Sequence, residues 1–338
     1  MGRGRIAVAA ALAAAALAAC SGSLEPGTNE GDVLHLALNQ TETHPSYVAL
    51  AGWAEHLEAE TDGRWTIDVY PNETLGAQAE ALQLVSDGSV ELTIVSGSQL
   101  ENLNRDFIAL NLPTTFDDID HQMRVVHDMD IVGELYSSLE ETNNFTVLGG
   151  FTQGSRSVYT TFGPVETPAD LAGYKLRVQE SELNIAMAQA LGAAATPMAF
   201  GELYTGLQSG VVDAAENNEV SYATQRHYEV APHWTYTNHL VGLDYLIMNT
   251  AMLDSMTEAD RAVFLEGWEQ ARAEHVELWL EATAQAVAQA EAGGATFYEI
   301  DDSVFFEALE PLAERFLTSD VQWEIYDDAR AASTRSDG

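Results

Sequence analysis

The amino-terminal third of the chain alternates short apolar runs with helix-patterned segments, and this order constrains the fold more than any other feature. Residues 33–38, 65–70 and 90–95 have the length and composition of strands. Between them, residues 47–60 and 77–85 carry apolar side chains at helical spacing. Strands separated by helices in this way pair in parallel, with the helices as crossover connections. The sequence therefore predicts an open α/β sheet.

The rest of the chain continues this alternation. Further strands are expected at residues 145–151, 158–162, 175–178, 211–214 and 243–248. Further helices are expected at residues 182–191, 202–208, 305–316 and 322–331. A chain of this length with 46% hydrophobic residues can bury a large core and is not a disordered polymer.

One predicted helix is unusually long. Residues 257–291 are helical in pattern almost without interruption, and Gly293 and Gly294 end the run. At 1.5 Å per residue this helix is roughly 50 Å long. Its apolar residues are expected to form one stripe: Val263, Phe264, Trp268, Val276, Trp279, Leu280 and Val287. A helix of this length can extend beyond one domain, so we expect it to brace two.

The amino terminus has the pattern of an export signal. Arg3 and Arg5 precede an apolar, alanine-rich run over residues 6–17, which is too short for an ordinary membrane-spanning helix. The sequence Leu-Ala-Ala-Cys, ending at Cys20, then matches the lipobox at which bacterial lipoproteins are cleaved. We therefore expect residues 1–19 to be a lipoprotein signal peptide. The alternative is a plain signal peptide that is cleaved nearby.

Cys20 is the only cysteine of the chain. It has no partner for a disulfide, so the fold depends on its core alone. In the lipoprotein interpretation Cys20 carries the acyl chains, which anchor the protein stably to a membrane. Residues 20–31 would then form a polar, flexible tether. The expected location is extracytoplasmic, either lipid-anchored to the outer face of the cytoplasmic membrane or periplasmic.

The chain is strongly acidic, with 53 acidic residues against 14 basic ones and a net charge of −39. Lys175 is the only lysine. Such a surface argues against nucleic acid and anionic membranes as partners. We interpret the charge as a solubility device for a salty environment rather than as a cation buffer. An anionic ligand would have to be held by local arginines against this field.

Signatures of catalysis and metal binding are missing from the sequence. HExxH, GxSxG, Walker and GxGxxG motifs are absent, so we expect no enzyme and no cofactor. Pairs such as His121 and His127 are six residues apart, which does not place two imidazoles on one helical face, so no metal site is expected. The acidic run at residues 117–120 is interpreted as the cap of a helix that begins near Ile119.

Several ordered motifs carry a family resemblance. They are Gly-Ser-Arg ending at Arg156, RVQES at residues 177–181, TPMAFGELY at 196–204 and D-x-x-E-N at 213–217. Together with Val-Tyr-Pro-Asn at 69–72 and Thr-Asn-His at 237–239, they resemble the solute-binding proteins of tripartite ATP-independent periplasmic (TRAP) transporters, the dicarboxylate-receptor family. The resemblance covers roughly residues 32–316.

The resemblance implies a two-lobed α/β fold of the periplasmic-binding-protein type II kind, with the long helix spanning both lobes. Lobe 1 would comprise about 32–155 and a later segment of about 240–270. Lobe 2 would comprise about 156–239 and the C-terminal helices, within a domain of residues 32–338. The implied partners are a small organic acid and the membrane subunits of a TRAP transporter.

The resemblance also implies ligand-binding residues. Arg177 ends a predicted strand, where open α/β sheets bind ligands, and its guanidinium can hold a carboxylate through two hydrogen bonds. In the family the matching arginine makes this contact. Arg156 matches a second arginine near the ligand, Asn217 an asparagine that bonds the acid, and Phe200 an aromatic residue that packs on it. The alternatives are a surface salt bridge for Arg177, a turn for Asn217 and the core for Phe200.

Three further residues are weaker candidates. Glu80 lies on a predicted helix, where its carboxylate could accept hydrogen bonds from sugar hydroxyls or simply face solvent. Asn39 and His44 lie in the loop after the first strand, where they either face the cleft or are ordinary loop residues.

The motifs also suggest a ligand class. Many family members have proline after the Glu-Asn pair, whereas this chain has Asn218. RVQES and Glu-Asn-Asn resemble the branch that binds sugar acids, particularly hexuronates such as glucuronate and galacturonate. A dicarboxylate or keto acid remains an alternative ligand, and a membrane sensor kinase remains an alternative partner.

Overall fold

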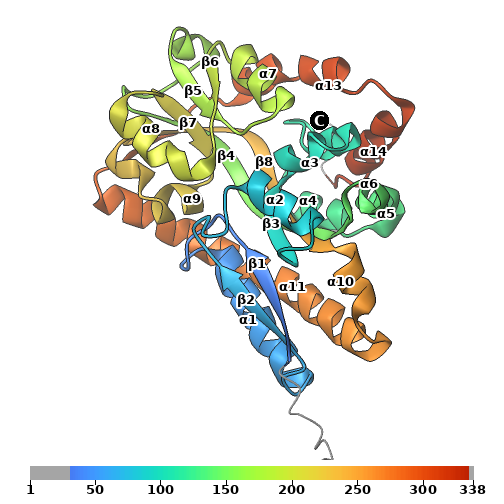
Figure 1. The fold of residues 1–338 in the computed structure, drawn as a ribbon. Helices are drawn as coiled ribbons and strands as arrows, with labels where there is room; N and C mark the ends of the chain where they lie inside the picture. The colour runs from blue at the N-terminus through green and yellow to red at the C-terminus, as the bar shows by residue number, and fades with distance from the viewer. Residues whose placement is uncertain (1–30, 335–338) are drawn as a thin grey trace, which may run out of the picture.

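The computed structural model describes residues 31–334 of the chain (Figure 1). The predicted signal peptide, Cys20 and nearly all of the predicted tether lie outside the described residues. Within residues 31–334, none of the helices has both the length and the apolar character that crossing a membrane requires.

The first half of the sheet has the predicted β-α-β-α-β order. Its strands are β1 (Asp32–Ala37), β2 (Trp65–Tyr70) and β3 (Leu92–Ser96), and β1 pairs in parallel with both others. They are connected by α1 (Pro45–Glu60) and α2 (Gln78–Ser86). Alternating apolar residues bury one side of β1 and β2, whereas all of β3 is buried, and Leu34, Leu36 and Leu92 are fully buried.

A second set of parallel strands forms the other half. It contains β5 (Lys175–Val178), β6 (Ala194–Pro197) and β7 (Ala214–Asn217). The helices α7 (Glu182–Ala190) and α8 (Leu203–Ser209) connect them. The strand expected at residues 211–214 therefore begins three residues later than predicted. Gly210 ends α8 in the left-handed conformation, and Val211 is half exposed in the turn that follows.

Two long antiparallel strands join the halves into one sheet, in the order β2-β1-β3-β8-β4-β7-β5-β6, with β9 (Thr296–Tyr298) paired to β8. They are β4 (Phe145–Thr160) and β8 (His233–Asn249). The prediction of two separate strands at 145–151 and 158–162 was wrong, and the strand at 243–248 was predicted too short. Glycines at 149, 150 and 154 and three shifts of register interrupt the apolar alternation that the prediction used.

This topology brings strand ends together at the middle of the sheet. Because β3 and β7 are both linked through the antiparallel β8–β4 pair, the two parallel sets run in opposite directions. Ser96 at the end of β3 pairs with Asp244 of β8, and Asn217 at the end of β7 pairs with Ser157 of β4. The carboxyl ends of the two sets therefore face each other across the centre of β4 and β8.

The long helix α11 (Glu258–Ala292) contacts both halves, as predicted (Figure 1). Near its start, Phe264 packs against Trp53 of α1 with ring centroids 4.7 Å apart. Near its end, Gln289 donates a hydrogen bond to the carbonyl of Ala223 in α9 (Glu219–Thr224). Most of the predicted apolar stripe is buried or half-buried, but Leu280 is 61% exposed.

Shorter helices complete the fold. They are α3 (Gly97–Glu101), α4 (Ile119–Val126), α5 (Met129–Ser137), α6 (Glu140–Asn143), α10 (Thr250–Ser255), α12 (Ser303–Leu309), α13 (Pro311–Phe316) and α14 (Asp320–Ala331). Asp118 caps α4 by accepting a hydrogen bond from the His121 amide at 2.7 Å, as predicted. The single helix expected at 305–316 is divided, because Pro311 has no amide hydrogen for a continuous helix. α12 and α13 contact α7, whereas α14 contacts α5.

Candidate functional site

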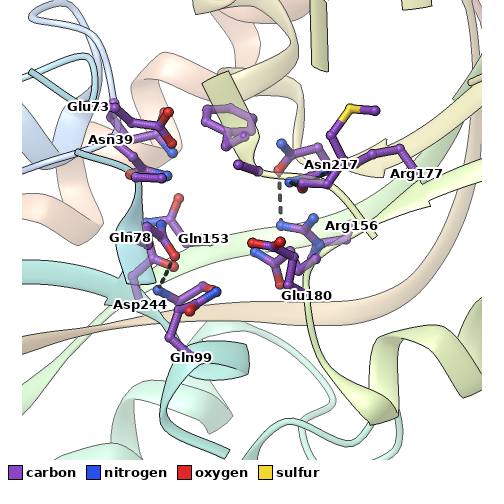
Figure 2. Close-up of a pocket in the computed structure, with 17 residues that line it drawn as sticks. Asn39, Glu73, Gln78, Gln99, Gln153, Arg156, Arg177, Glu180, Asn217 and Asp244 are labelled. Carbon is purple, nitrogen blue, oxygen red and sulfur yellow. Dashed lines mark hydrogen bonds between the residues drawn. The ribbon is translucent and has the colours of Figure 1, made fainter. Parts of the chain in front are cut away.

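A pocket lies where the two sets of strand ends meet. Figure 2 shows Asn39, Glu73 and Gln78 on one side and Arg156, Arg177 and Asn217 on the other. The remaining lining residues are Gln40, Ala77, Ser96, Gln99, Gln153, Gln179, Glu180, Met198, Ala199, Phe200 and Asp244. Five of the seven predicted ligand-binding residues thus line one pocket: Arg177, Arg156, Asn217, Phe200 and Asn39.

Arg177, in β5, is 2% exposed and lines the pocket. Its Nε and Nη2 donate to the carbonyl oxygen of Met198 at 3.0 and 2.7 Å. Nη1 has no hydrogen-bond partner among the described residues. The side of the guanidinium that carries Nε is therefore occupied, whereas at the end formed by Nη1 and Nη2 the buried Nη1 has no acceptor among residues 31–334. Burial lowers the pKa of Arg177, yet an arginine remains charged at neutral pH.

Arg156, in β4, is held by a buried acid. Its Nε and Nη2 donate to the two carboxylate oxygens of Glu216 at 2.5 and 2.8 Å, which is a side-on bidentate pair. Although burial opposes ionisation, the charge of Arg156 and the neighbouring His239 lower the pKa of Glu216 to about 2. The charge of Arg156 is therefore largely neutralised before any ligand arrives.

Asn217, at the end of β7, has its side-chain orientation fixed by three donors. Its Oδ1 accepts from Arg156 Nη1 at 3.0 Å, from the Asn218 amide at 2.9 Å and from Asn218 Nδ2 at 3.1 Å. The Nδ2 group is left to donate to a ligand. Asn218, the departure from the family's proline, thus helps to hold Asn217 in place and also caps α9 through the Ser221 amide.

Phe200 forms part of the pocket beside Arg177, and the guanidinium carbon lies 5.9 Å from the centre of its ring. Phe200 is only half-buried, so one face of the ring is available to the pocket. Such a ring can pack on the apolar face of a sugar while Arg177 holds a charged group.

The facing wall consists mostly of amide and acidic side chains, and except for Asn39 the sequence analysis did not predict them. Asn39 and Gln40 follow β1, and Glu73 follows β2, so their position after a strand was a usable signal. The side-chain oxygens of Asn39 and Gln40 are buried without a hydrogen-bond partner in the described part of the chain. Gln153 and Asp244 come from the centres of β4 and β8, whose lengths were not predicted.

Two predicted residues do not line the pocket. His44 is fully buried and caps α1, because its Nδ1 accepts from the Ser46 amide at 3.2 Å. Burial lowers the pKa of His44 to about 3, so the ring is neutral. Glu80 is exposed, and its carboxylate accepts from the Ala77 amide at the start of α2. In this structure both side chains serve helix ends.

No group of three or more His, Cys, Asp and Glu side chains within residues 31–334 is arranged to hold a metal ion. The pocket instead combines one open arginine edge with amide, hydroxyl and carboxylate groups. This set suits a small, polar, anionic organic molecule.

Comparison with known proteins agrees with this class of site. The family described as bacterial extracellular solute-binding protein, family 7 (DctP) matches residues 36–320. The chain belongs to this family, which comprises extracellular substrate-binding receptors. A solute-binding protein from Chromohalobacter salexigens is 32% identical over 283 residues, covering 83% of this chain and 84% of the relative.

Solved structures give the same result. A TRAP periplasmic solute-binding protein from Anaerococcus prevotii with bound glucuronate has a TM-score of 0.86 and 34% identity, covering 89% of this chain and 97% of its own. A TRAP periplasmic solute-binding protein from Bradyrhizobium sp. with bound galacturonate has a TM-score of 0.84 and 29% identity, covering 89% of this chain and 100% of its own. The resemblance inferred from the motifs and the two-lobed fold class are confirmed.

Proposed function

We propose that this protein is an extracytoplasmic receptor that captures a hexuronate, such as glucuronate or galacturonate, and delivers it to the membrane subunits of a TRAP transporter. The unpartnered Nη1 of Arg177, in a pocket lined mainly by amide and acidic side chains that can bond hydroxyl groups, is the observation that carries the proposal. The hexuronates bound in two similar TRAP receptors support the same ligand class.

The carboxylate of the ligand would bind at the arginine side. Two parallel hydrogen bonds from Nη1 and Nη2 of Arg177 fit a carboxylate that approaches the guanidinium end-on. The free Nδ2 of Asn217 and the second hydrogen of Arg156 Nη1 can donate to the same group. The sugar hydroxyls would then face Asn39, Gln40 and the other amides of the opposite wall.

Contacts between the two sides of the pocket support a capture mechanism in which the lobes enclose the ligand. Asn102 Nδ2 donates to the carbonyl of Glu180 at 2.8 Å, and Arg105 Nη1 lies 2.9 Å from a carboxylate oxygen of Glu182. Enclosure removes water from the arginine–carboxylate pair, so the remaining polar groups of the ligand must be satisfied by the pocket. We propose lobe boundaries near residues 155 and 240, on the two strands β4 and β8.

The proposed mode of attachment is a lipid on Cys20, with residues 20–31 as a tether. The lipobox and the position of the lone cysteine support it. The protein would bind and release its ligand without catalysis, in keeping with a receptor family and with the absence of catalytic motifs from the sequence.

A thermal-shift screen tests the proposed ligand. A ligand that binds only the folded protein raises its stability by RT ln(1 + [L]/Kd), about 4 kcal/mol at a thousandfold excess over Kd. Glucuronate or galacturonate should raise Tm more than succinate, malate or pyruvate. A screen in which the dicarboxylates or keto acids raise Tm and the hexuronates do not contradicts the proposal. Hexuronate uptake that depends on the receptor in vesicles containing the transporter subunits would distinguish a transport role from a partnership with a sensor kinase.

A further inference from the structure

We propose that Asp244 is the specificity-determining residue that accepts hydrogen bonds from neighbouring hydroxyl groups of the ligand and excludes ligands with a second carboxylate. This inference rests on the proposed function and adds to it: the pocket would select acids with one carboxylate and several hydroxyls.

Asp244 lies in β8 directly opposite Ser96, at the end of β3. Figure 2 shows it away from Arg177, with Gln78 and Gln99 on the same side of the pocket. It also lines a smaller adjoining cavity, whose other polar residues include Ser98 and Asn184. The two cavities share Ser96, Arg156, Gln179 and Asp244, so Asp244 lies where the main pocket meets a polar recess.

The carboxylate of Asp244 is buried without a protein donor. The residue is 5% exposed, and no hydrogen bond from any residue between 31 and 334 reaches its carboxylate. Arg156 is the charged neighbour whose field reaches it, but the bidentate donors of that guanidinium are taken by Glu216. An acid buried in this way is destabilising unless something supplies hydrogen bonds.

Other acids of the same region differ from Asp244. Glu216 is equally buried but is paired with Arg156. Glu101 accepts from Asn111 Nδ2 at 3.0 Å, and Glu73 accepts from the backbone amide of Gly201. Glu180 is exposed. Glu73 and Glu101 each keep one oxygen without a partner, but Asp244 is the buried acid of the pocket for which neither oxygen accepts a hydrogen bond from residues 31–334.

A polyhydroxylated acid supplies these donors. The two oxygens of a carboxylate can accept from two adjacent hydroxyl groups, as a sugar ring offers. The amides of Gln78 and Gln99 can act as donor or acceptor toward the same hydroxyls. A second carboxylate at this end would offer no donor and would bring like charges together in a buried site. A site built around hydroxyl donors rejects ligands that lack them.

The test uses two acids with the same carbon skeleton: D-glucuronate, and D-glucarate, which has a carboxylate at both ends. Calorimetric titration at pH 8 would compare the wild type, Asp244→Asn and the matched control Asp68→Asn, an exposed acid on β2 outside the pocket. The wild type should bind glucarate at least about a hundredfold more weakly than glucuronate. Asp244→Asn should lose about ten- to a hundredfold in glucuronate affinity. The ratio of the glucuronate affinity to the glucarate affinity should also fall by about tenfold or more in this variant.

The outcomes separate the two proposals. Unchanged glucuronate affinity in Asp244→Asn, or equal binding of the two acids by the wild type, overturns the role of Asp244 and leaves the proposed function intact. A wild type that binds a dicarboxylate and no hexuronate contradicts both. The variant should remain folded, because the Asp244 carboxylate accepts no hydrogen bond from residues 31–334, and a thermal melt checks this. If Asp244→Asn does not fold, Asp244→Ser provides the same comparison.

Discussion

Arg156 and Glu216 form a buried bidentate ion pair in which Nε and Nη2 lie 2.5 and 2.8 Å from the two carboxylate oxygens. The sequence analysis expected both arginines of the pocket to bind the ligand. Because of this ion pair, however, their charges are not equally available. The charge of Arg156 is matched within the protein, whereas Nη1 of Arg177 has no partner among residues 31–334. Arg156 thus orients Asn217, and Arg177 carries a positive charge that forms no salt bridge with residues 31–334.

Glu216→Gln should lower the free energy of unfolding by about 3–5 kcal/mol, because it leaves the buried Arg156 charge without its counter-ion. Urea denaturation at pH 7.5 measures this. Glu182→Gln is the matched control, since the partner of Glu182 is the surface residue Arg105 and such pairs contribute at most about 1 kcal/mol. Equal stability of Glu216→Gln and the control would show that the pair does not hold this part of the sheet.

Asp244 should make the stability of the ligand-free protein depend on pH. Burial raises the pKa of Asp244 from 3.8 to about 7, so the folded state holds a proton that the unfolded state has lost. The contribution of this group to the free energy of unfolding is fully present below about pH 4 and falls as pH rises toward 7. At pH 8, Asp244→Asn should therefore be more stable than the wild type, by up to about 4 kcal/mol.

Urea denaturation of the two proteins at a series of pH values from 4 to 8 checks this difference. Glu101, whose pKa burial also raises to about 7, is present in both proteins and cancels in the comparison. A wild type that matches or exceeds the variant at pH 8 would mean that water or a neighbouring group satisfies the Asp244 carboxylate.

The sequence was most informative where local pattern and tertiary fold agree. The β-α-β-α-β order of residues 32–96 and the 35-residue helix α11 were predicted from periodicity. The two long strands were not, because their centres cross from one half of the sheet to the other. Where β4 passes the pocket, Gly154 and Arg156 stand in place of alternating apolar residues. The apolar alternation that identifies a strand is therefore interrupted at the pocket.

The same reason explains which pocket residues could be foreseen. Arg177, Asn217 and Phe200 lie in motifs near strand ends, so the resemblance located them. Asp244 lies inside β8 within an apolar run, where nothing in the sequence distinguishes an acid that lines a pocket from any other strand residue. Glu80 and His44 were credible candidates from position alone, but their side chains serve the ends of α2 and α1.

Cys20→Ser should leave ligand binding unchanged and release the protein from the membrane. The reason is that Cys20 lies before the described fold and is the only cysteine, so it has no disulfide to lose. Fractionation of cells that express each form, followed by a high-salt wash of the membranes, measures the release. A serine variant that is still processed and still sediments with membranes would contradict lipidation at this residue.

Arg177→Lys should bind the ligand much more weakly than its retained charge suggests. The open end of the guanidinium offers Nη1 and Nη2 together, and an ammonium group is a point charge that cannot donate two parallel hydrogen bonds. It would also lose the contacts to the Met198 carbonyl that orient the side chain. Calorimetric titration with the hexuronate found by the screen measures the change.

Arg177→Ala should be weaker still, because it leaves the ligand carboxylate buried and unpaired at a cost of roughly 2–5 kcal/mol. This corresponds to a loss of affinity of about thirty- to several-thousand-fold. Neither variant should unfold, since burial already disfavours the charge of Arg177, and within residues 31–334 its side chain donates hydrogen bonds to one carbonyl only and forms no salt bridge. Thermal melts without ligand check this. If Arg177→Ala bound as tightly as the wild type, the carboxylate would be held elsewhere. The free hydrogen on Nη1 of Arg156 would then be the first donor to examine, through Arg156→Lys in the same titration.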